Sequence, residues 1–158
     1  MATREKLIAG LELTVTEAKR TTSLFAEGEW NSKRPCGWTP KEVYSHLASV
    51  AALVPNLAQG LVSASEDKDI AEGMDIDQMN AQAVAAMAAM TPQQVMAALE
   101  ANYAKLIGFV KSVPDEQLNV KRRFISDAVL VSDILANAIM LHGLHHVYEA
   151  ASNTGEPD

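Results

Sequence analysis

The distribution of histidines is the most informative chemical feature of this sequence. His46 stands alone in the first third of the chain, whereas His142, His145 and His146 lie together in the segment LHGLHHVYEA. On a helix, an i, i+4 spacing places two side chains on the same face, so His142 and His146 should point in one direction. One distant imidazole and one such pair supply the three protein ligands of a metal site that keeps an open coordination position.

Hydrophobic periodicity predicts that these three histidines face the interior. In the second predicted helix the face that carries His46 also carries four aliphatic residues: Val43, Val50, Leu53 and Leu57. In the last predicted helix the face of His142 and His146 also carries Leu135, Ile139 and Glu149. The same 3.6-residue period turns His145 to one side, toward the rim of the site.

Buried imidazoles are costly unless their nitrogens find partners, and a divalent cation would satisfy three of them at once. The alternative is that each histidine bonds a backbone carbonyl or a water, and that the clustering is accidental. Catalytic zinc sites use three protein ligands and a water, but nickel, iron and manganese also accept imidazole. The residues themselves do not choose among these metals.

Composition narrows the class of protein. Apolar residues make up 48% of the 158 residues and aromatic residues 5%, which favours helices over sheets. The net charge of −7 argues against a nucleic-acid partner. The single cysteine, Cys36, excludes an intramolecular disulfide and fits a reducing cytoplasm. No apolar run approaches about 18 residues, so we expect no membrane partner and one soluble domain over residues 1–158.

Start and stop signals predict four long helices. The clearest start is Thr39-Pro40-Lys41-Glu42, which combines an N-cap Thr, Pro at the first helical position and a capping-box Glu. Pro55 should kink or end the regular part of that helix. The predicted helices cover residues 3 to about 26, 40 to about 62, and 77–90, and the segment from 92 to about 111 is either a new helix or a kinked continuation. The last helix begins at Ser126 or Ser132 and ends before Gly155. Residues 119–126 are expected to be irregular, and the whole pattern predicts an all-α four-helix bundle.

Five segments together carry a family resemblance: GWTPKEVYSHLA, DIDQMNAQAV, TPQQVMAALE, VPDEQL and ILANAIMLHGLHHVYEA. With these segments the chain resembles the DinB-like superfamily, which includes the DinB/YfiT proteins and the N-terminal domain of mycothiol-dependent maleylpyruvate isomerase. The resemblance implies a DinB/YfiT-type bundle that binds one divalent metal ion, zinc or nickel before iron or manganese. It also implies that His46, His142 and His146 are the ligands. The basic and Gln residues that often follow the His-His step in the family are replaced here by Val147, Tyr148 and Glu149.

Four further residues are candidates for the site. Glu149 can face the same cavity as the histidine pair, where it would fix a histidine tautomer or act as a base; the alternative is an exposed Glu at a helix end. Asn80 matches the family's Asn on the third helix by position, and a surface or capping role fits it equally well. Tyr44 and Tyr148 could reach the mouth of a substrate pocket, with simple packing as the alternative. Trp38 is expected to be a hydrophobic staple at the bundle end.

Three functions follow from this pattern. In the first, the metal activates a low-molecular-weight thiol for transfer to an electrophilic small molecule, as in some relatives. In the second, the same ligands serve a hydrolase with Glu149 as the base. In the third, the protein is a non-catalytic, stress-related bundle. We also expect a homodimer, with the Ala/Met-rich stretch from Ala81 to Met90 as its seam.

Overall fold

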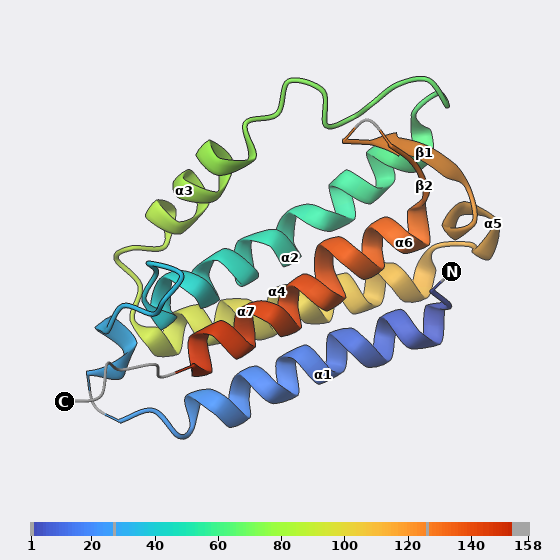
Figure 1. Ribbon diagram of the computed structural model, residues 1–158. Coiled ribbons are helices and arrows are strands. Elements are labelled where there is room, and N and C mark those ends of the chain that lie inside the picture. Colours follow the sequence, from blue (N-terminus) through green and yellow to red (C-terminus); the bar gives the residue numbers. More distant parts are fainter. Residues whose placement is uncertain (1, 27, 126, 153–158) are drawn as a thin grey trace.

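Four long helical segments run side by side in the computed structural model, which describes residues 2–26, 28–125 and 127–152 (Figure 1). Three of them are single helices: α1 (Arg4–Thr22), α2 (Pro40–Ser63) and α4 (Pro92–Ser112). The fourth consists of α6 (Val131–Leu135), the π-helix η2 (Ala136–Leu141) and α7 (His142–Ala151) in direct succession. The predicted all-α four-helix bundle is confirmed.

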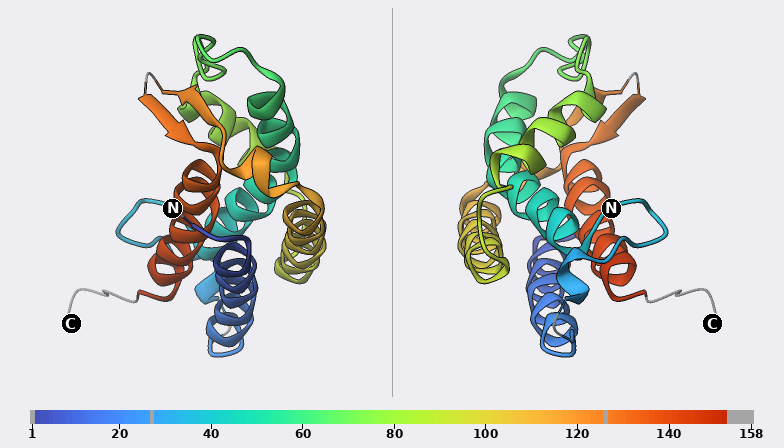
Figure 2. Two further views of the ribbon diagram at one scale, coloured as in Figure 1. Left: turned by 90° about the vertical axis from the view of Figure 1, so that its right-hand side faces the viewer. Right: turned by 90° about the vertical axis from the view of Figure 1, so that its left-hand side faces the viewer.

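The four segments form a ring in which each helix contacts two neighbours. Going around it, α1 packs on α4, α4 on α2, α2 on α7, and α7 on α1 again. A shorter helix, α3 (Ile76–Ala86), lies outside the ring along α2 and carries the chain back, so that α2 and α4 run parallel (Figures 1 and 2). The first and the last helical segments of the chain therefore pack around the same core. None of the described helices is long and apolar enough to cross a bilayer.

Side-chain caps define where the long helices begin. The predicted capping box of α2 is present, with the Thr39 N–H donating to Glu42 Oε2 over 2.8 Å. Thr91 and Gln94 form the same arrangement at the start of α4. These bonds satisfy amides that have no partner inside the helix, which is why both helices start at a Thr-Pro step.

The core face of α2 differs from the predicted one. Leu53 is 50% exposed, whereas Ala51, Val54 and Ala58 are buried at 4% or less. The helix passes Pro55 and continues to Ser63, close to the predicted end near residue 62. The buried face of α2 is therefore shifted toward small residues, and Leu53 lies at the edge of the core.

Two other expectations are corrected. Helix α3 ends at Ala86 rather than near Met90. Residues 119–126, expected to be irregular, contain the strand β1 (Lys121–Phe124), which pairs with β2 (Asp127–Leu130) in an antiparallel hairpin. The short helix α5 (Asp115–Leu118) precedes them. Arg122 binds the carbonyls of Leu61 and Val62 and so ties the hairpin to the C-terminal end of α2. The last segment begins at Val131, and Ser126 lies outside the described residues.

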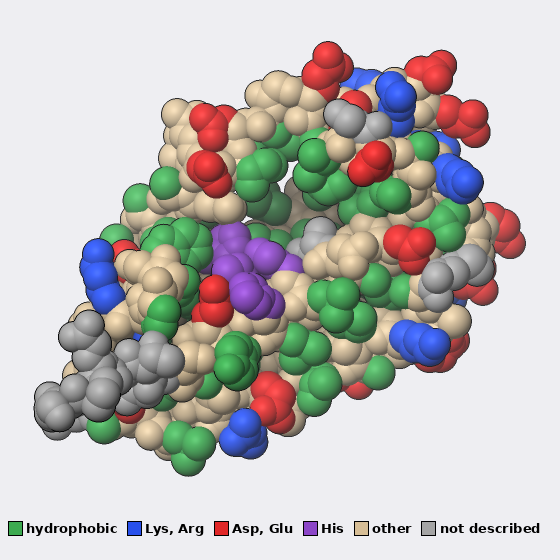
Figure 3. All heavy atoms as spheres, in the orientation of Figure 1, with side chains coloured by type: hydrophobic (Ala, Val, Ile, Leu, Met, Phe, Trp, Pro, Cys, Tyr) green, Lys and Arg blue, Asp and Glu red, His purple; other side chains and the backbone are tan. Residues whose placement is uncertain are grey.

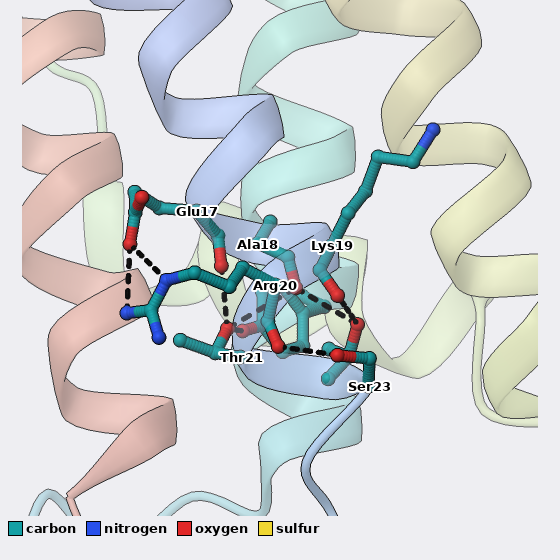
Figure 4. A network of polar contacts seen from close by, with 8 residues as sticks. Glu17, Ala18, Lys19, Arg20, Thr21 and Ser23 are labelled. Carbon is teal, nitrogen blue, oxygen red and sulfur yellow. Dashed lines mark hydrogen bonds and ion pairs between the residues drawn. The ribbon is translucent and has the colours of Figure 1, made fainter.

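The last turn of α1 is held by local polar contacts (Figure 4). Arg20 pairs with Glu17 over 2.9 Å, and the Ser23 hydroxyl donates to the Arg20 carbonyl. The Thr21 hydroxyl donates to the Glu17 carbonyl over 2.8 Å and also lies 2.9 Å from the hydroxyl of Tyr44. These contacts fix the end of α1 against α2 just before the chain leaves the bundle.

Candidate metal centre

Three imidazole rings from opposite ends of the chain meet between α2 and α7. The Nε2 atoms of His46 and His142 lie 3.1 Å apart, and those of His142 and His146 lie 3.0 Å apart. In the space-filling view the histidine side chains gather at the floor of a hollow in one face of the molecule (Figure 3). The fold thus brings together the three residues that the sequence predicts as ligands, which in the chain are separated by 96 positions between His46 and His142.

The opposite ring nitrogens show how the three rings can be protonated. His146 Nδ1 lies 2.6 Å from Glu149 Oε2, so this nitrogen donates its proton to the carboxylate and leaves Nε2 with a lone pair. Within the described chain, the Nδ1 atoms of His46 and His142 are buried and have no hydrogen-bond partner. A single proton can bridge only one pair of the converging Nε2 atoms, so the cluster cannot satisfy itself.

The donor set fits a divalent metal ion. Two imidazole nitrogens bound at about 2.0–2.1 Å to a tetrahedral zinc are about 3.3 Å apart, close to the separations found here. Three nitrogen lone pairs directed at one point repel each other unless a cation lies between them. His46, His142 and His146 could therefore hold one divalent ion.

Burial keeps these rings in the neutral form that binds metals. Desolvation lowers the pKa of His46 to about 3 and that of His142 to about 4, and the neighbouring histidines add to both effects. Desolvation also lowers the pKa of His146, although the hydrogen bond to Glu149 opposes it. At neutral pH all three imidazoles are thus available as uncharged ligands.

Close packing of the last segment on α1 sets the position of His142. A Cβ atom at Gly143 would lie 2.8 Å from the Tyr103 hydroxyl and 2.9 Å from Thr14 Cγ2, so only glycine fits this approach. The π-helix η2 immediately before His142 has wider turns, which rotates the face of α7 relative to that of α6. Leu141, the last residue of η2, is 54% exposed.

Trp38 covers the histidine cluster. Its ring meets His46 edge-on with the centroids 5.2 Å apart and stacks on His146 at 6.3 Å. The loop that carries it is closed by a 2.8 Å bond from the Arg34 N–H to the Trp38 carbonyl, with Gly37 at a φ of +86°. The buried Arg34 also donates from Nε to the Ala150 carbonyl of α7 over 3.0 Å. Trp38 thus lies over the site, a role that its position ahead of a capping box did not reveal.

A second group of possible ligands adjoins the first. Glu149 Oε1 lies 3.2 Å from Nε2 of His145, while its other oxygen binds His146. The side chain of His145 is 61% exposed, in agreement with its expected place at the rim. Glu149 lies on the Nδ1 side of His146, away from the converging Nε2 atoms, and therefore orients that ring.

The remaining predicted pocket residues lie in different surroundings. Tyr44 is fully buried and bonds Thr21, and burial raises its pKa to about 12. Its predicted place at a pocket mouth is therefore corrected, because its phenol is sealed inside the bundle. Tyr148 is 73% exposed on the outer side of α7. Asn80 lines a cavity of about 670 Å³ between the start of α2 and α3, and Trp38 forms another part of its lining.

Comparison with known proteins identifies the family. The model of the mycothiol maleylpyruvate isomerase N-terminal domain matches residues 11–147. The chain belongs to this family. The DinB-like resemblance is thereby confirmed, and no protein of curated function matches the sequence.

Solved structures show the same fold. Mycothiol-dependent maleylpyruvate isomerase superposes with a TM-score of 0.74 at 15% identity, over 96% of this chain and 62% of that one. A histidine-to-alanine mutant of it gives 0.74 at 14% identity, over 94% and 61%. YfiT from Bacillus subtilis, described as a probable metal-dependent hydrolase with an unusual four-helix bundle topology, gives 0.68 at 15% identity, over 93% and 83%. This chain spans about three fifths of the isomerase's length.

Proposed function

We propose that this protein binds one divalent metal ion through His46, His142 and His146 and uses it to transfer a low-molecular-weight thiol to an electrophilic small molecule. The metal-binding part is supported by the position of His142 Nε2, which lies 3.1 Å from that of His46 and 3.0 Å from that of His146, with the three ligand atoms within 4.8 Å of one another. Zinc or nickel is the proposed ion, because neutral imidazole suits both. The thiol chemistry is carried over from the mycothiol-dependent isomerase that shares the fold.

The chain's own residues have separable roles in this proposal. A divalent ion supplies one piece of chemistry, a lowered pKa for a coordinated thiol, which then remains a thiolate nucleophile near neutral pH. Glu149 holds His146 in the tautomer that exposes Nε2 to the ion. Trp38 excludes water from one side of the cluster. The exposed His145, in contact with Glu149, offers a route by which a released proton reaches solvent.

Hydrolysis is the second candidate, because YfiT is described as a probable metal-dependent hydrolase. It would use the same three histidines to activate water. The placement of Glu149 weighs against the version in which this residue is the base. Both of its oxygens already contact imidazoles, and they lie behind His146 rather than beside the open face of the cluster. A hydrolase built on this site would need another proton acceptor.

Two measurements test the proposal. Protein purified without a histidine tag should contain about one zinc or nickel ion per chain by elemental analysis. Metal-loaded protein should then consume electrophiles, such as a maleyl or epoxide compound, only when a small thiol is added. Ester or amide turnover without thiol would favour the hydrolase, and metal-free protein from metal-supplemented cells would overturn the metal-binding proposal itself.

The homodimer and the cytoplasmic location also remain proposals. The stretch from Ala81 to Met90, expected to form the dimer seam, carries Ala81, Ala85 and Ala88 on the wall of the 670 Å³ cavity. Sedimentation equilibrium at micromolar concentration would establish the oligomeric state. A monomer would leave the site intact, because all three proposed ligands come from one chain.

A further inference from the structure

The cavity between α2 and α3 has the size of a small-molecule site and adjoins the histidine cluster. Its volume of about 670 Å³ falls within the range of about 300–1,000 Å³ that is typical of ligand pockets. Trp38 lines it and also contacts His46 and His146, while Ser45, the neighbour of His46, forms part of the wall. A ligand in this cavity could therefore contact the same indole ring that contacts the proposed metal ligands.

A polar residue of α2 also lines the cavity. Ser45 is 2% exposed, and the cavity is bounded in part by this residue, so its hydroxyl is available as a hydrogen-bond partner for a bound molecule. Asn80 adds a half-buried amide on the opposite wall.

The charges around the cavity select against anions. Glu42 and Asp77 contribute two carboxylates to the lining, whereas the single cation, Lys41, already donates to the Ala88 carbonyl over 2.7 Å. A helix N-terminus often attracts anions through its free amides. Here the capping box occupies the amides of Thr39 and Glu42, and Pro40 has none. The start of α2 is therefore a poor anion site.

The walls also provide apolar surface for a cationic ligand. One side is formed by small aliphatic residues of α3 and the loop after it: Ala81, Val84, Ala85 and Ala88. The indole of Trp38 also lines the cavity, and an aromatic ring attracts ammonium groups when they are partly desolvated. Carboxylates, a hydroxyl and an aromatic ring together form a set of contacts that complements a protonated amine on a small apolar body.

We propose that this cavity is a binding site for an amine-bearing small molecule, held by Asp77, Ser45 and Asn80 against Trp38. Binding of the amine does not require the metal. Only its further role, as the part of a substrate that is presented to the histidine cluster, rests on the proposed function. None of the residues that form this site is a predicted metal ligand.

A matched series of ligands tests the charge preference. Benzylamine, benzyl alcohol and benzoate share one apolar body and differ in charge. The indole N–H signal of Trp38, assigned with a Trp38→Phe variant, reports binding in two-dimensional NMR spectra of the full chain. Benzylamine should shift this signal saturably in the millimolar range, benzyl alcohol more weakly, and benzoate should leave it unchanged up to the same concentration.

Variants locate the site. Asp77→Asn should weaken benzylamine binding about threefold, as expected for loss of one partly exposed ion pair, and Asp77→Glu should restore most of it. Ser45→Ala should weaken it about fivefold through loss of one hydrogen bond. Glu12→Gln, which removes an exposed carboxylate on α1 away from the cavity, is the control and should have no effect. Equal binding of benzoate and benzylamine, or equal effects of Asp77→Asn and Glu12→Gln, would overturn the proposal.

The same titration separates this proposal from the function of the metal centre. In a His142→Ala variant, benzylamine should still shift the Trp38 signal although metal binding is lost. Amine binding in a protein that takes up no metal would overturn the proposed function and leave the amine site standing. Metal uptake without any benzylamine response would overturn the amine site and leave the proposed function standing.

Discussion

Two groups of side chains that could hold a metal ion meet at His146, and they differ in how their polar atoms are satisfied. In the inner group, His46, His142 and His146, the Nε2 atom of His142 lies about 3 Å from the other two, with His46 buried and the pair half-buried. The outer group, His145, His146 and Glu149, lies closer to solvent, and its carboxylate contacts both imidazoles. Residue types and spacings alone would rate both as ligand sets. The difference lies in the ring nitrogens: within the described chain, the Nε2 atoms of the inner group have no hydrogen-bond partner outside the cluster, whereas in the outer group a carboxylate already binds the ring nitrogens.

The largest expected effect comes from breaking the inner group. His142→Ala should reduce the metal content from about one ion per chain to nearly none, because two imidazoles are a weak site for a divalent ion. Elemental analysis gives the metal content, and circular dichroism should show an unchanged helical signal. Stoichiometric metal in this variant would show that His142 is not a ligand.

A second prediction concerns the metal-free protein at low pH. His46 and His142 have pKa values lowered by burial to about 3 and about 4, against an ordinary value of 6.5 in the unfolded chain. The unfolded state therefore binds more protons below pH 6.5, and stability is complete above that pH and falls as the pH decreases toward 4. The slope can reach about 1.4 kcal/mol per pH unit for each group.

Thermal melts of chelator-treated protein between pH 7.5 and 5 would check this slope. A variant with both histidines replaced by Gln should show a flatter profile over the same range. An unchanged profile would mean that other groups dominate the acid response.

The link between the two groups is tested by Glu149→Gln. Loss of the carboxylate that orients His146 should weaken metal binding about 10- to 100-fold, as is usual for residues that orient a ligand. Competition with a chelator of known affinity measures the change. An effect as large as that of His142→Ala would indicate that Glu149 is itself a ligand.

Packing behind the inner group is tested by Gly143→Ala. The added methyl would press against Tyr103 and Thr14, so we expect a loss of about 1–3 kcal/mol in the free energy of unfolding. Gly108→Ala is a matched control on α4, where a Cβ atom meets nothing within 4 Å and helix propensity should add up to about 1 kcal/mol. Equal effects in urea titrations would show that the contact at Gly143 can relax.

The smallest effect is expected for the outer group. His145→Ala removes a largely exposed ring that contacts one carboxylate oxygen of Glu149 and the edge of the site at His146, so metal affinity should change by less than about twofold and stability by less than about 0.5 kcal/mol. A tenfold loss of metal in this variant would move the candidate site outward, to the group around Glu149.

The helices and the meeting of the three histidines could be predicted from the sequence, because helix start signals and the spacing of His142 and His146 are local properties of the chain. It did not predict which face of α2 enters the core. That face is decided by the close approach of neighbouring helices over Ala51 and Ala58, which is a property of the assembled bundle. The π-helix, the hairpin and the burial of Tyr44 against Thr21 likewise depend on partners far away in the chain.

The position of Trp38 over the histidines could not be predicted from the sequence. A tryptophan ahead of a capping box is usually a staple, and nothing in the local pattern connects it with His146, which lies more than a hundred positions away. Its contacts arise because the loop after the short helix η1 (Glu29–Asn31) folds back over the end of α7. The only local hint is the polar, glycine-containing turn that lets the loop reverse.

Arg34 couples that loop to the last helix. One guanidinium is bound to the Ala150 carbonyl, and the backbone of the same residue holds Trp38 in its turn. Moving the backbone of this loop away from α7 would break the contact to Ala150 or pull the terminal turn of α7 along. The buried Arg34 therefore couples the position of the loop to the end of the helix that bears His142 and His146.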